Sequence, residues 1–455
     1  MTAQHSVGFW EALRFWLKLG FISFGGPAGQ IAVMHKELVV EKRWISEQRF
    51  LHALNYCMLL PGPEAQQLAT YIGWLLHRTW GGVVAGALFV LPSLVILITL
   101  SWIYVAFGHV PWVAGLFYGI KPAVAALVLQ AVHRMGGKTL RHPSQAPLLW
   151  LIALGSFIAI GLFSLPFPAI VLAALTAGWL GGRFAPRQFS PPRSAHASGI
   201  ARTKPLPALI DDLTPVPDHA RFSRGRLARV LTAGAALWLL PMGVLVAWQG
   251  WGGTLAAMGW FFTKAALLTF GGAYAVLPYV YQGAVVEHGW LLGPQMIDGL
   301  ALGETTPGPL IMVVAFVGFL GGWGQQVLGP GALFLGGALA AAVVTWFTFL
   351  PSFLFILAGG PLVESTHGKL HFTAPMMAIT AAVVGVIASL AMFFLSHVLW
   401  RETVRGDWLG RLDWVALGMV VLAAVALIGF KQGVVRVILS SALAGWLFQT
   451  VGWVG

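Results

Sequence analysis

Residues 60–67 read LPGPEAQQ, and a second Pro-Gly-Pro stands at residues 307–309, within the stretch GETTPGP. The two tripeptides are 246 positions apart. The same offset connects further pairs: Phe15, Lys18, Phe24, Gly25, Gly26 and Trp44 recur as Phe261, Lys264, Phe270, Gly271, Gly272 and Trp290. A constant offset across separate motifs indicates that the chain arose by internal duplication.

The composition is typical of a membrane protein. Of 455 residues, 58% are hydrophobic and only 9% are charged, which is too few charges for the surface of a soluble protein of this length. Apolar runs such as 81–107 and 227–248 exceed the ~20 helical residues that cross a hydrocarbon core. We therefore predict an all-α polytopic membrane protein embedded in a lipid bilayer.

The remaining composition excludes several other classes. The net charge of +12 would suggest nucleic acid binding in a soluble domain, but here the basic residues gather in loops beside apolar segments, where they orient a membrane protein. Cys57 is the only cysteine, so no internal disulfide can form. The histidines show no metal-ligand spacing, and we predict neither a metal nor a cofactor.

We divide the chain into four parts. They are a first repeat at 1–182, a basic cytoplasmic linker at 183–228, a connecting transmembrane helix at 229–250 and a second repeat at 251–455. The first apolar segment lacks the features of a cleaved signal peptide and is expected to remain.

Seven apolar segments separate equivalent points of the two repeats, at 8–34, 50–78, 82–107, 111–133, 148–163, 166–182 and 229–250. An odd number of crossings predicts that the second repeat is inverted relative to the first. This prediction requires 148–163 and 166–182 to cross separately, although each is shorter than the ~20 residues of a straight span.

Segments 8–34 and 50–78 are each broken at mid-length, and we interpret both as re-entrant hairpins. The loop between them carries Lys36, Lys42, Arg43 and Arg49 and would then return to the cytoplasmic side. The positive-inside rule places the linker and the loop with Arg134, Lys138 and Arg141 on that side as well.

The breaks are the candidate functional site. Paired glycines unwind a helix cheaply and proline can begin a new one, so each break exposes backbone that must line a cavity or be buried in protein. Matching breaks in two inverted repeats predict a substrate site near the membrane midplane. Free N–H groups at helix amino termini favour an anion. A single break of this kind is more often a packing or hinge device, but four in paired positions favour a site.

Side chains near the breaks supply further donors and charges. Lys18 and Lys264 would attract a dianion, unless both snorkel to the membrane interface. Glu64 and Glu304 would carry a coupling proton, unless they serve as helix-terminal carboxylates. The predicted anion site comprises Lys18, Ser23, Gly25, Gly26, Pro27, Gln30, Pro61, Gly62, Pro63, Gln66, Lys264, Thr269, Gly271, Gly272, Thr305, Thr306, Pro307, Gly308 and Pro309.

Two further residues give weaker signals, since Asp298 is a lesser candidate and Lys121 is expected at the interface. The chain has no phosphate-binding loop of the GxxxxGK[ST] type, so we do not expect it to hydrolyse ATP. An intramembrane enzyme is the alternative from another class. It would need a histidine or paired carboxylates facing one cavity.

At these motifs the sequence resembles the chromate transporter family, in its long form with two fused homologous domains. The resemblance rests on FGGP at 24–27, LPGPEAQQ at 60–67, GETTPGP at 303–309 and AFVG at 315–318, and it covers the chain apart from the linker. It implies an inner-membrane secondary transporter that exports chromate and confers chromate resistance. Sulfate is the structural analogue, and sulfate uptake is the alternative function.

The second repeat departs from the family pattern of the first. Ala273 stands where the first repeat has Pro27, and Leu310 stands opposite Glu64. We therefore expect the two repeats to contribute unequally to the site. The sequence leaves open the coupling ion, the direction of transport and whether the chain forms a homodimer.

Overall fold

The computed structural model describes residues 7–24, 26–108, 110–140, 142–189, 208–211, 214, 217–270, 272–365, 373–400 and 411–451. Most of these residues are helical, and the only β structure among them is two isolated bridges. Six of the described helices are long and apolar enough to cross a membrane. The prediction of an all-α, multi-pass membrane protein is confirmed.

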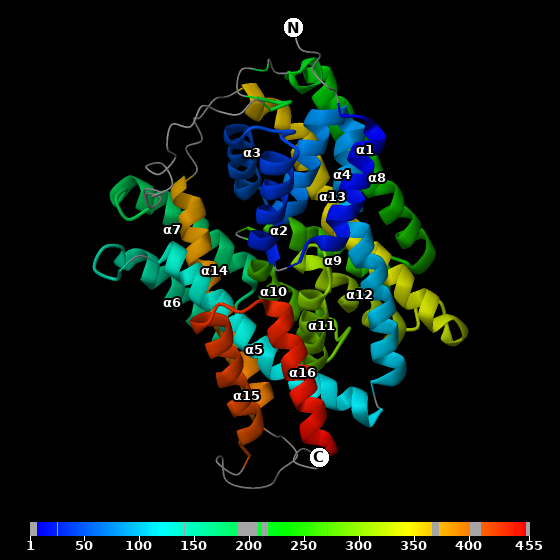
Figure 1. Cartoon of the computed structure of the whole chain (residues 1–455), viewed down its shortest axis with the longest axis vertical. Coiled ribbons are helices and arrows are strands. Elements are labelled where there is room, and N and C mark those ends of the chain that lie inside the picture. Colours follow the sequence, from blue (N-terminus) through cyan, green and yellow to red (C-terminus); the bar gives the residue numbers. More distant parts are fainter. Residues whose placement is uncertain are drawn as a thin grey trace.

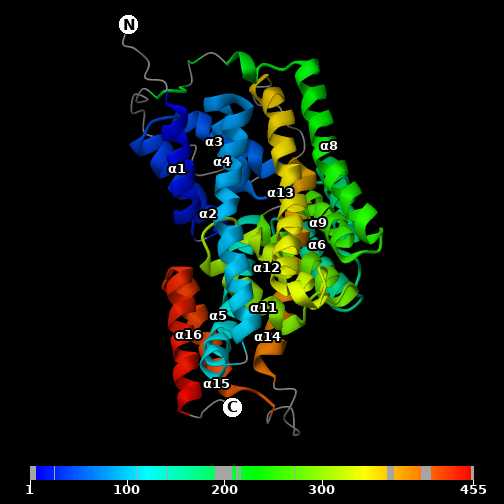
Figure 2. The ribbon, with the colours of Figure 1, turned by 90° about the vertical axis from the view of Figure 1, so that its right-hand side faces the viewer.

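The helices of the first half are α1 (Phe9–Ile22), α2 (Gly26–His35), α3 (Glu47–Leu59), α4 (Glu64–Phe107), α5 (Pro111–Thr139), α6 (Pro147–Gly161) and α7 (Phe167–Phe184). Those after the linker are α8 (Arg224–Gln249), α9 (Thr254–Leu268), α10 (Ala273–Tyr281), α11 (Gly293–Thr305), α12 (Val313–Gly324), α13 (Leu333–Ser365), α14 (Thr373–Leu399), α15 (Trp414–Ala424) and α16 (Val434–Thr450). Figures 1 and 2 show their arrangement.

Helix boundaries recur between the halves at the offset seen in the sequence. A π-helical turn at Lys36–Glu41 follows α2, and another at Gln282–Glu287 follows α10, 246 positions later. The helices α3 and α11 have the same offset at both ends. The duplicated sequence therefore folds into duplicated elements.

Helices α1 and α2 fold back on each other. The rings of Phe15 and Trp44 lie 5.1 Å apart across the break at residues 23–25, and Lys18 Nζ lies 3.1 Å from Glu37 Oε1. In a single straight helix, residues this far apart in sequence would be separated by several turns and could not touch. Segment 8–34 is therefore a hairpin, as the broken pattern suggested.

Segment 50–78 ends close to the beginning of α1. The His77 ring lies 2.9 Å from the carbonyl oxygen of Val7 and packs against Phe9 at the beginning of α1. Between these points the chain passes the break at 60–63, so residues 7 and 77 lie at the same end of the molecule.

Helix α4 consists of two packed arms. Its backbone is non-helical at His77 and Arg78, and Arg78 has a φ of 57°. A Cβ on Gly73 would lie 2.5 Å from the Gly81 carbonyl oxygen, so the residues on either side of this turn are in close contact. The boundary expected between segments 50–78 and 82–107 falls at this reversal.

The short segments 148–163 and 166–182 form two arms. The Leu148 N–H, at the start of α6, donates to Gln188 Oε1 just beyond α7, at 3.1 Å. Both helices pack on α14. The chain therefore reverses between them, as the inverted arrangement requires.

Part of the predicted linker is docked on the first repeat. Ile210 forms a parallel β-bridge with Ile45, and the His219 ring lies 2.9 Å from the Trp74 carbonyl oxygen. Ile210 and Ala220 are buried. The predicted linker is therefore held against the first repeat at residues 208–211 and 217–220. Residues 190–207 lie outside the described part of the chain.

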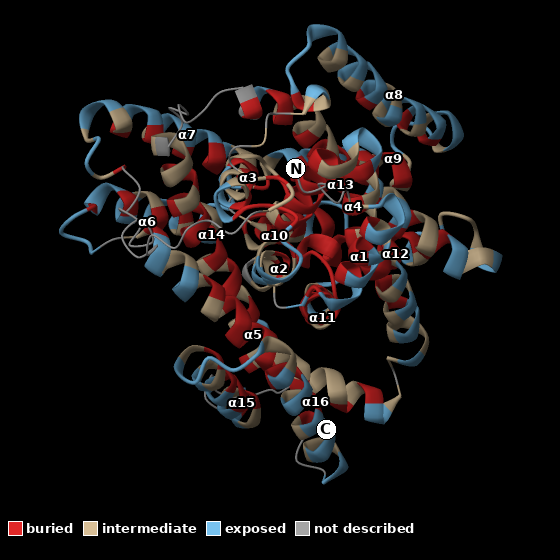
Figure 3. Cartoon of the chain, turned by 45° about the horizontal axis from the view of Figure 1, so that its top comes forward, coloured by how far each residue is buried: buried red, intermediate tan, exposed pale blue. Residues whose placement is uncertain are grey.

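Burial is greatest where the hairpins of the two halves meet. Figure 3 shows buried residues gathered around α2, α10 and α11, whereas the outward faces of α8, α15 and α16 are exposed. Residues 310–320 are buried without interruption. The second repeat thus supplies most of the core that surrounds the breaks.

Candidate functional site

The breaks of the two halves are hydrogen-bonded to each other. The Gly62 N–H donates to the Thr269 carbonyl at 2.8 Å, and the Gly308 N–H donates to the Ser23 carbonyl at 2.8 Å. These four residues form two equivalent pairs under the offset of 246, so each half gives the same bond that it receives. Gly62 and Gly308 have φ values of 124° and 108°, a conformation that favours glycine.

The hydroxyl groups at the breaks are satisfied within their own helices. Ser23 and Thr269 donate to carbonyls one turn earlier at 2.6 Å, from Leu19 and Ala265 respectively. Thr305 and Thr306 also donate to carbonyls of α11, at 3.0 Å and 3.1 Å. These hydroxyls would have to rotate before they could donate to an anion. The first-turn N–H groups of α2 and α4 are the more direct donors, because helix geometry leaves them without intrahelical acceptors.

Three buried amides surround the breaks. Gln30 Nε2 donates to the Gly308 carbonyl at 2.5 Å and thereby connects the two halves. Gln66 and Gln67 donate to Thr70 and to the Pro61 carbonyl. The Oε1 atoms of Gln66 and Gln67 are buried without a hydrogen-bond partner in the described residues. Rotation of either amide would turn its NH₂ group to that position. Gln67 was part of the quoted motif but was not assigned a role.

The prolines frame these breaks. Pro63 precedes the first residue of α4, and Pro309 precedes the short turn Leu310–Met312 that leads into α12. Pro61 accepts the Gln67 bond, and Pro307 is buried. Gly26 and Gly272 have φ values of 70° and 98°, whereas Pro27 is half-buried in the first turn of α2. Gly25 and Gly271 lie outside the described residues.

Two carboxylates lie beside the breaks, and two exposed cations of α5 act on them through space. Glu304 is buried and accepts a hydrogen bond from the Tyr274 hydroxyl, and Glu64 is half-buried at the start of α4. Arg134 interacts electrostatically with both carboxylates, and Lys138 interacts with Glu64. The positive-inside pattern predicts a loop at Arg134 and Lys138, but both residues belong to α5. Arg134 and Lys138 are four residues apart in the sequence, and this spacing could have predicted that they share one face of a helix.

The structure does not bring Lys18 and Lys264 to the breaks. Lys18 is 59% exposed and paired with Glu37. Lys264 is exposed, and its ammonium lies 5.8 Å from the centre of the Trp260 ring. Both side chains point to the outer surface, since the buried faces of their helices carry other residues. This placement favours the snorkelling interpretation over anion attraction.

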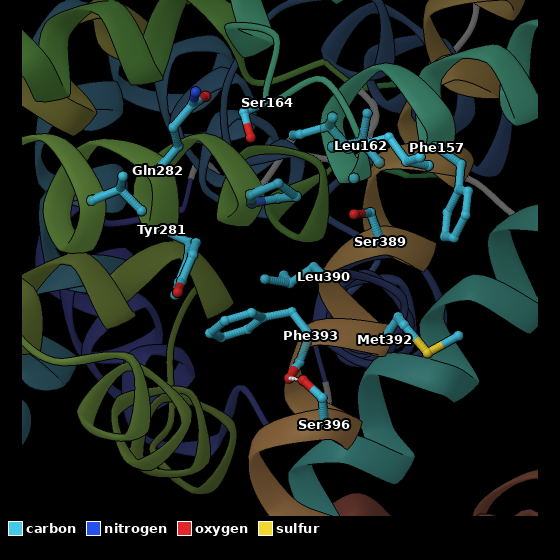
Figure 4. A pocket seen from close by; sticks show the side chains of 15 residues that line it. Phe157, Leu162, Ser164, Tyr281, Gln282, Ser389, Leu390, Met392, Phe393 and Ser396 are labelled. Atoms are coloured by element: carbon cyan, nitrogen blue, oxygen red, sulfur yellow. Dashed lines mark hydrogen bonds between the residues drawn. The ribbon is translucent and has the colours of Figure 1, made fainter. Parts of the chain in front are cut away.

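A separate cavity of about 450 Å³ lies between the α6–α7 turn, α10 and α14. Figure 4 shows its lining, which is largely apolar with a few hydroxyl groups such as Ser389 and Ser396. No described residue that lines it carries a charge, so it offers nothing to balance a dianion. The described residues also contain no cluster of three metal-binding side chains.

Comparison with known proteins gives the family. The sequence profile of the chromate transporter family matches residues 10–179 and again residues 256–446. The chain belongs to the chromate transporter family. The family profile thus matches each half separately, in agreement with the duplicated motifs and helices.

Relatives named as chromate transport proteins are similar over most of the chain. A chromate transport protein of Pseudomonas aeruginosa is 33% identical over 95% of this chain and 90% of its own length. A chromate transport protein of Cupriavidus metallidurans is 31% identical over 83% and 80%. A probable chromate transport protein of Synechococcus elongatus is 28% identical over 96% and 95%. No solved structure matches the chain. This family member is therefore a transporter, and the alternative of an intramembrane enzyme is set aside.

Proposed function

We propose that this transporter exports chromate across the inner membrane and so confers chromate resistance. The relatives named as chromate transport proteins support the substrate. The first-turn N–H groups at the breaks and the cations Arg134 and Lys138 suit a tetrahedral dianion. Sulfate has the same shape and charge, so it is the competitor that the site must exclude.

The observation that carries this proposal is the pair of bonds from Gly62 to Thr269 and from Gly308 to Ser23. We call the breaks of both halves, together with these two bonds, the centre. Because each repeat donates one bond and accepts the other, neither half forms the centre alone. We infer that the second repeat is inverted and that the halves rock about this centre, which opens to one side at a time. Glu64 and Glu304 are the proposed proton carriers at the breaks.

The test is uptake of labelled chromate by everted membrane vesicles from expressing and non-expressing cells. We expect energy-dependent accumulation in expressing vesicles, loss of accumulation when the proton gradient is collapsed, and weak competition by sulfate. Vesicles that contain the protein but accumulate no chromate would contradict export and favour sulfate uptake.

A variant of the centre makes the test specific. A side chain at Gly308 would be strained by its φ of 108° and would lie 2.7 Å from Ser93 Cβ. Gly308→Ala should therefore abolish accumulation at equal expression. Gly252→Ala is the matched control, because a Cβ at Gly252 meets no atom within 4 Å. Equal activity of both variants would remove the breaks from the mechanism.

A further inference from the structure

Asp298 is a buried acid whose charge is incompletely balanced. It lies at mid-length of α11 with 3% of its surface exposed. Its Oδ2 accepts a hydrogen bond from the Tyr104 hydroxyl at 2.9 Å and faces Lys121 Nζ at 3.7 Å. Its Oδ1 is buried and has no hydrogen-bond partner within the described chain. One oxygen is therefore held and the other is left bare.

This arrangement differs from that of a structural ion pair. Arg49 and Glu364 form such a pair at the linker end, where Arg49 also donates to the carbonyls of Asp211 and Thr214 and Glu364 accepts from Tyr71. A buried pair is stable only when further hydrogen bonds satisfy its remaining atoms. Asp298 lacks such a bond at Oδ1, so this oxygen is open to a proton.

The position of Asp298 connects it with both repeats. The helix α11 belongs to the second repeat and packs against α4 and α5 of the first, which carry Tyr104 and Lys121. Asp298 precedes Glu304 by six residues on the same helix, a distance of about 9 Å along its axis. A change of charge at Asp298 would therefore weaken a contact between the halves close to the breaks.

We propose that Asp298 binds one coupling proton of this transporter, in addition to those carried by Glu64 and Glu304 at the breaks, with Lys121 as its resident counter-cation and Tyr104 as its orienting donor. The inference rests on the proposed function. The proton adds to the bare Oδ1 and converts the carboxylate to a neutral carboxyl, which releases the Lys121 ammonium. The Lys121 side chain is 32% exposed, so the site has a route toward the surface.

A proton fits this site better than a metal cation. Lys121 already places a positive charge near the carboxylate, and a second cation would be repelled. The described groups that act on Asp298 are Lys121 and Tyr104. Asp413 is bonded to Tyr118, one turn before Lys121 on α5, and caps α15 through the Ala416 N–H.

The test uses the purified full chain in liposomes and two readouts. The first is exchange of labelled for unlabelled chromate without a gradient, and the second is accumulation driven by a pH gradient. A gradient of one pH unit is worth about tenfold in accumulation for each proton exchanged. We expect Asp298→Asn to exchange chromate at the wild-type rate and to lose that tenfold. Asp413→Asn should keep both activities, because asparagine also caps a helix.

Two further variants check the role of the neighbours. Lys121→Gln and Tyr104→Phe should move the pH of half-maximal driven transport upward, since each removes a group that stabilises the carboxylate. Lys121→Arg should restore the wild-type profile.

The outcomes separate the two claims. Wild-type driven accumulation in Asp298→Asn would overturn the coupling site. Loss of exchange in that variant would also overturn it, because Asp298 would then serve the fold or the anion site. Absence of exchange in the wild-type protein would instead contradict the proposed substrate.

Discussion

Arg134 on α5 is exposed and acts through space on both Glu64 and Glu304. We expect Arg134→Gln to raise the KM for chromate about two- to fivefold, or about 0.4–1 kcal/mol, because the variant removes an attraction for the dianion that solvent screens in part. Initial rates in everted vesicles measure this change. Lys18→Gln and Lys264→Gln should leave KM within about twofold, since both ammonium groups lie at the outer surface. A larger effect of Lys18→Gln than of Arg134→Gln would contradict this assignment.

Individual residues show what the sequence could and could not supply. The glycines and prolines of the breaks could be located because only unwound backbone needs them in an apolar segment. The state of the hydroxyls could not, since Ser23 and Thr269 donate to carbonyls of their own helices, which their residue types alone do not show. For Lys18 the sequence left both anion attraction and snorkelling open, because its position along α1 alone does not say whether it lies on the buried face. Its neighbours Phe15, Trp16 and Leu19 occupy the buried side.

At the scale of elements, the two arms of α4 depend on small residues where they touch. A Cβ on Gly86 would lie 2.3 Å from Thr70 Oγ1 and 2.5 Å from Phe353 Cε1. Gly86→Leu should therefore destabilise the protein by about 1–3 kcal/mol through overpacking. Thermal unfolding in detergent measures the loss. Gly243→Leu is the control on α8, where a Cβ meets no atom within 4 Å, and an equal loss there would refute the argument.

A buried ion pair stabilises the molecule at the end where the linker residues dock. Arg49 Nη1 lies 3.3 Å from Glu364 Oε2 and connects α3 with α13. Arg49→Gln should lower stability by about 3–5 kcal/mol, because the Glu364 carboxylate stays buried without its partner. The double variant with Glu364→Gln should recover part of that loss in the same melting assay. If the double variant is as unstable as the sum of the single variants, the pair is not coupled.

Helices and breaks could be predicted where composition and hydrophobic periodicity determine them. The broken segments, the boundary between residues 78 and 82 and the connecting helix expected at 229–250 follow from apolar length and from glycine and proline. In the structure that helix begins earlier, at Arg224. The docking of residues 208–211 and 217–220 could not be predicted, because the Pro and Arg content of 183–228 describes an average over a segment. The Ile45–Ile210 bridge depends on the position of a single side chain.

In the whole molecule, equivalent elements of the two repeats contact each other, but different side chains surround them. Bonds between the breaks repeat under the offset of 246, yet Gln30 reaches Gly308 whereas the equivalent position holds Val276. Asp298 likewise corresponds to His52 in the first repeat. Duplication could be predicted from sequence because it fixes residue spacing. The division of roles depends on which partner each copy meets in space, so it required the structure.

The rocking mechanism can be tested with single cysteines at equivalent positions of the two repeats. Phe24 and Phe270 flank the glycine breaks, and the buried Cys57 can first be replaced by serine. If the repeats are inverted, a membrane-impermeant thiol reagent should reach Phe24→Cys from one side of the membrane and Phe270→Cys from the other. Chromate should change the two labelling rates in opposite directions, because opening the centre to one side closes it to the other. Right-side-out and everted vesicles provide the two faces. Access from the same side at both positions would contradict inversion, and rates indifferent to chromate would contradict rocking about the breaks.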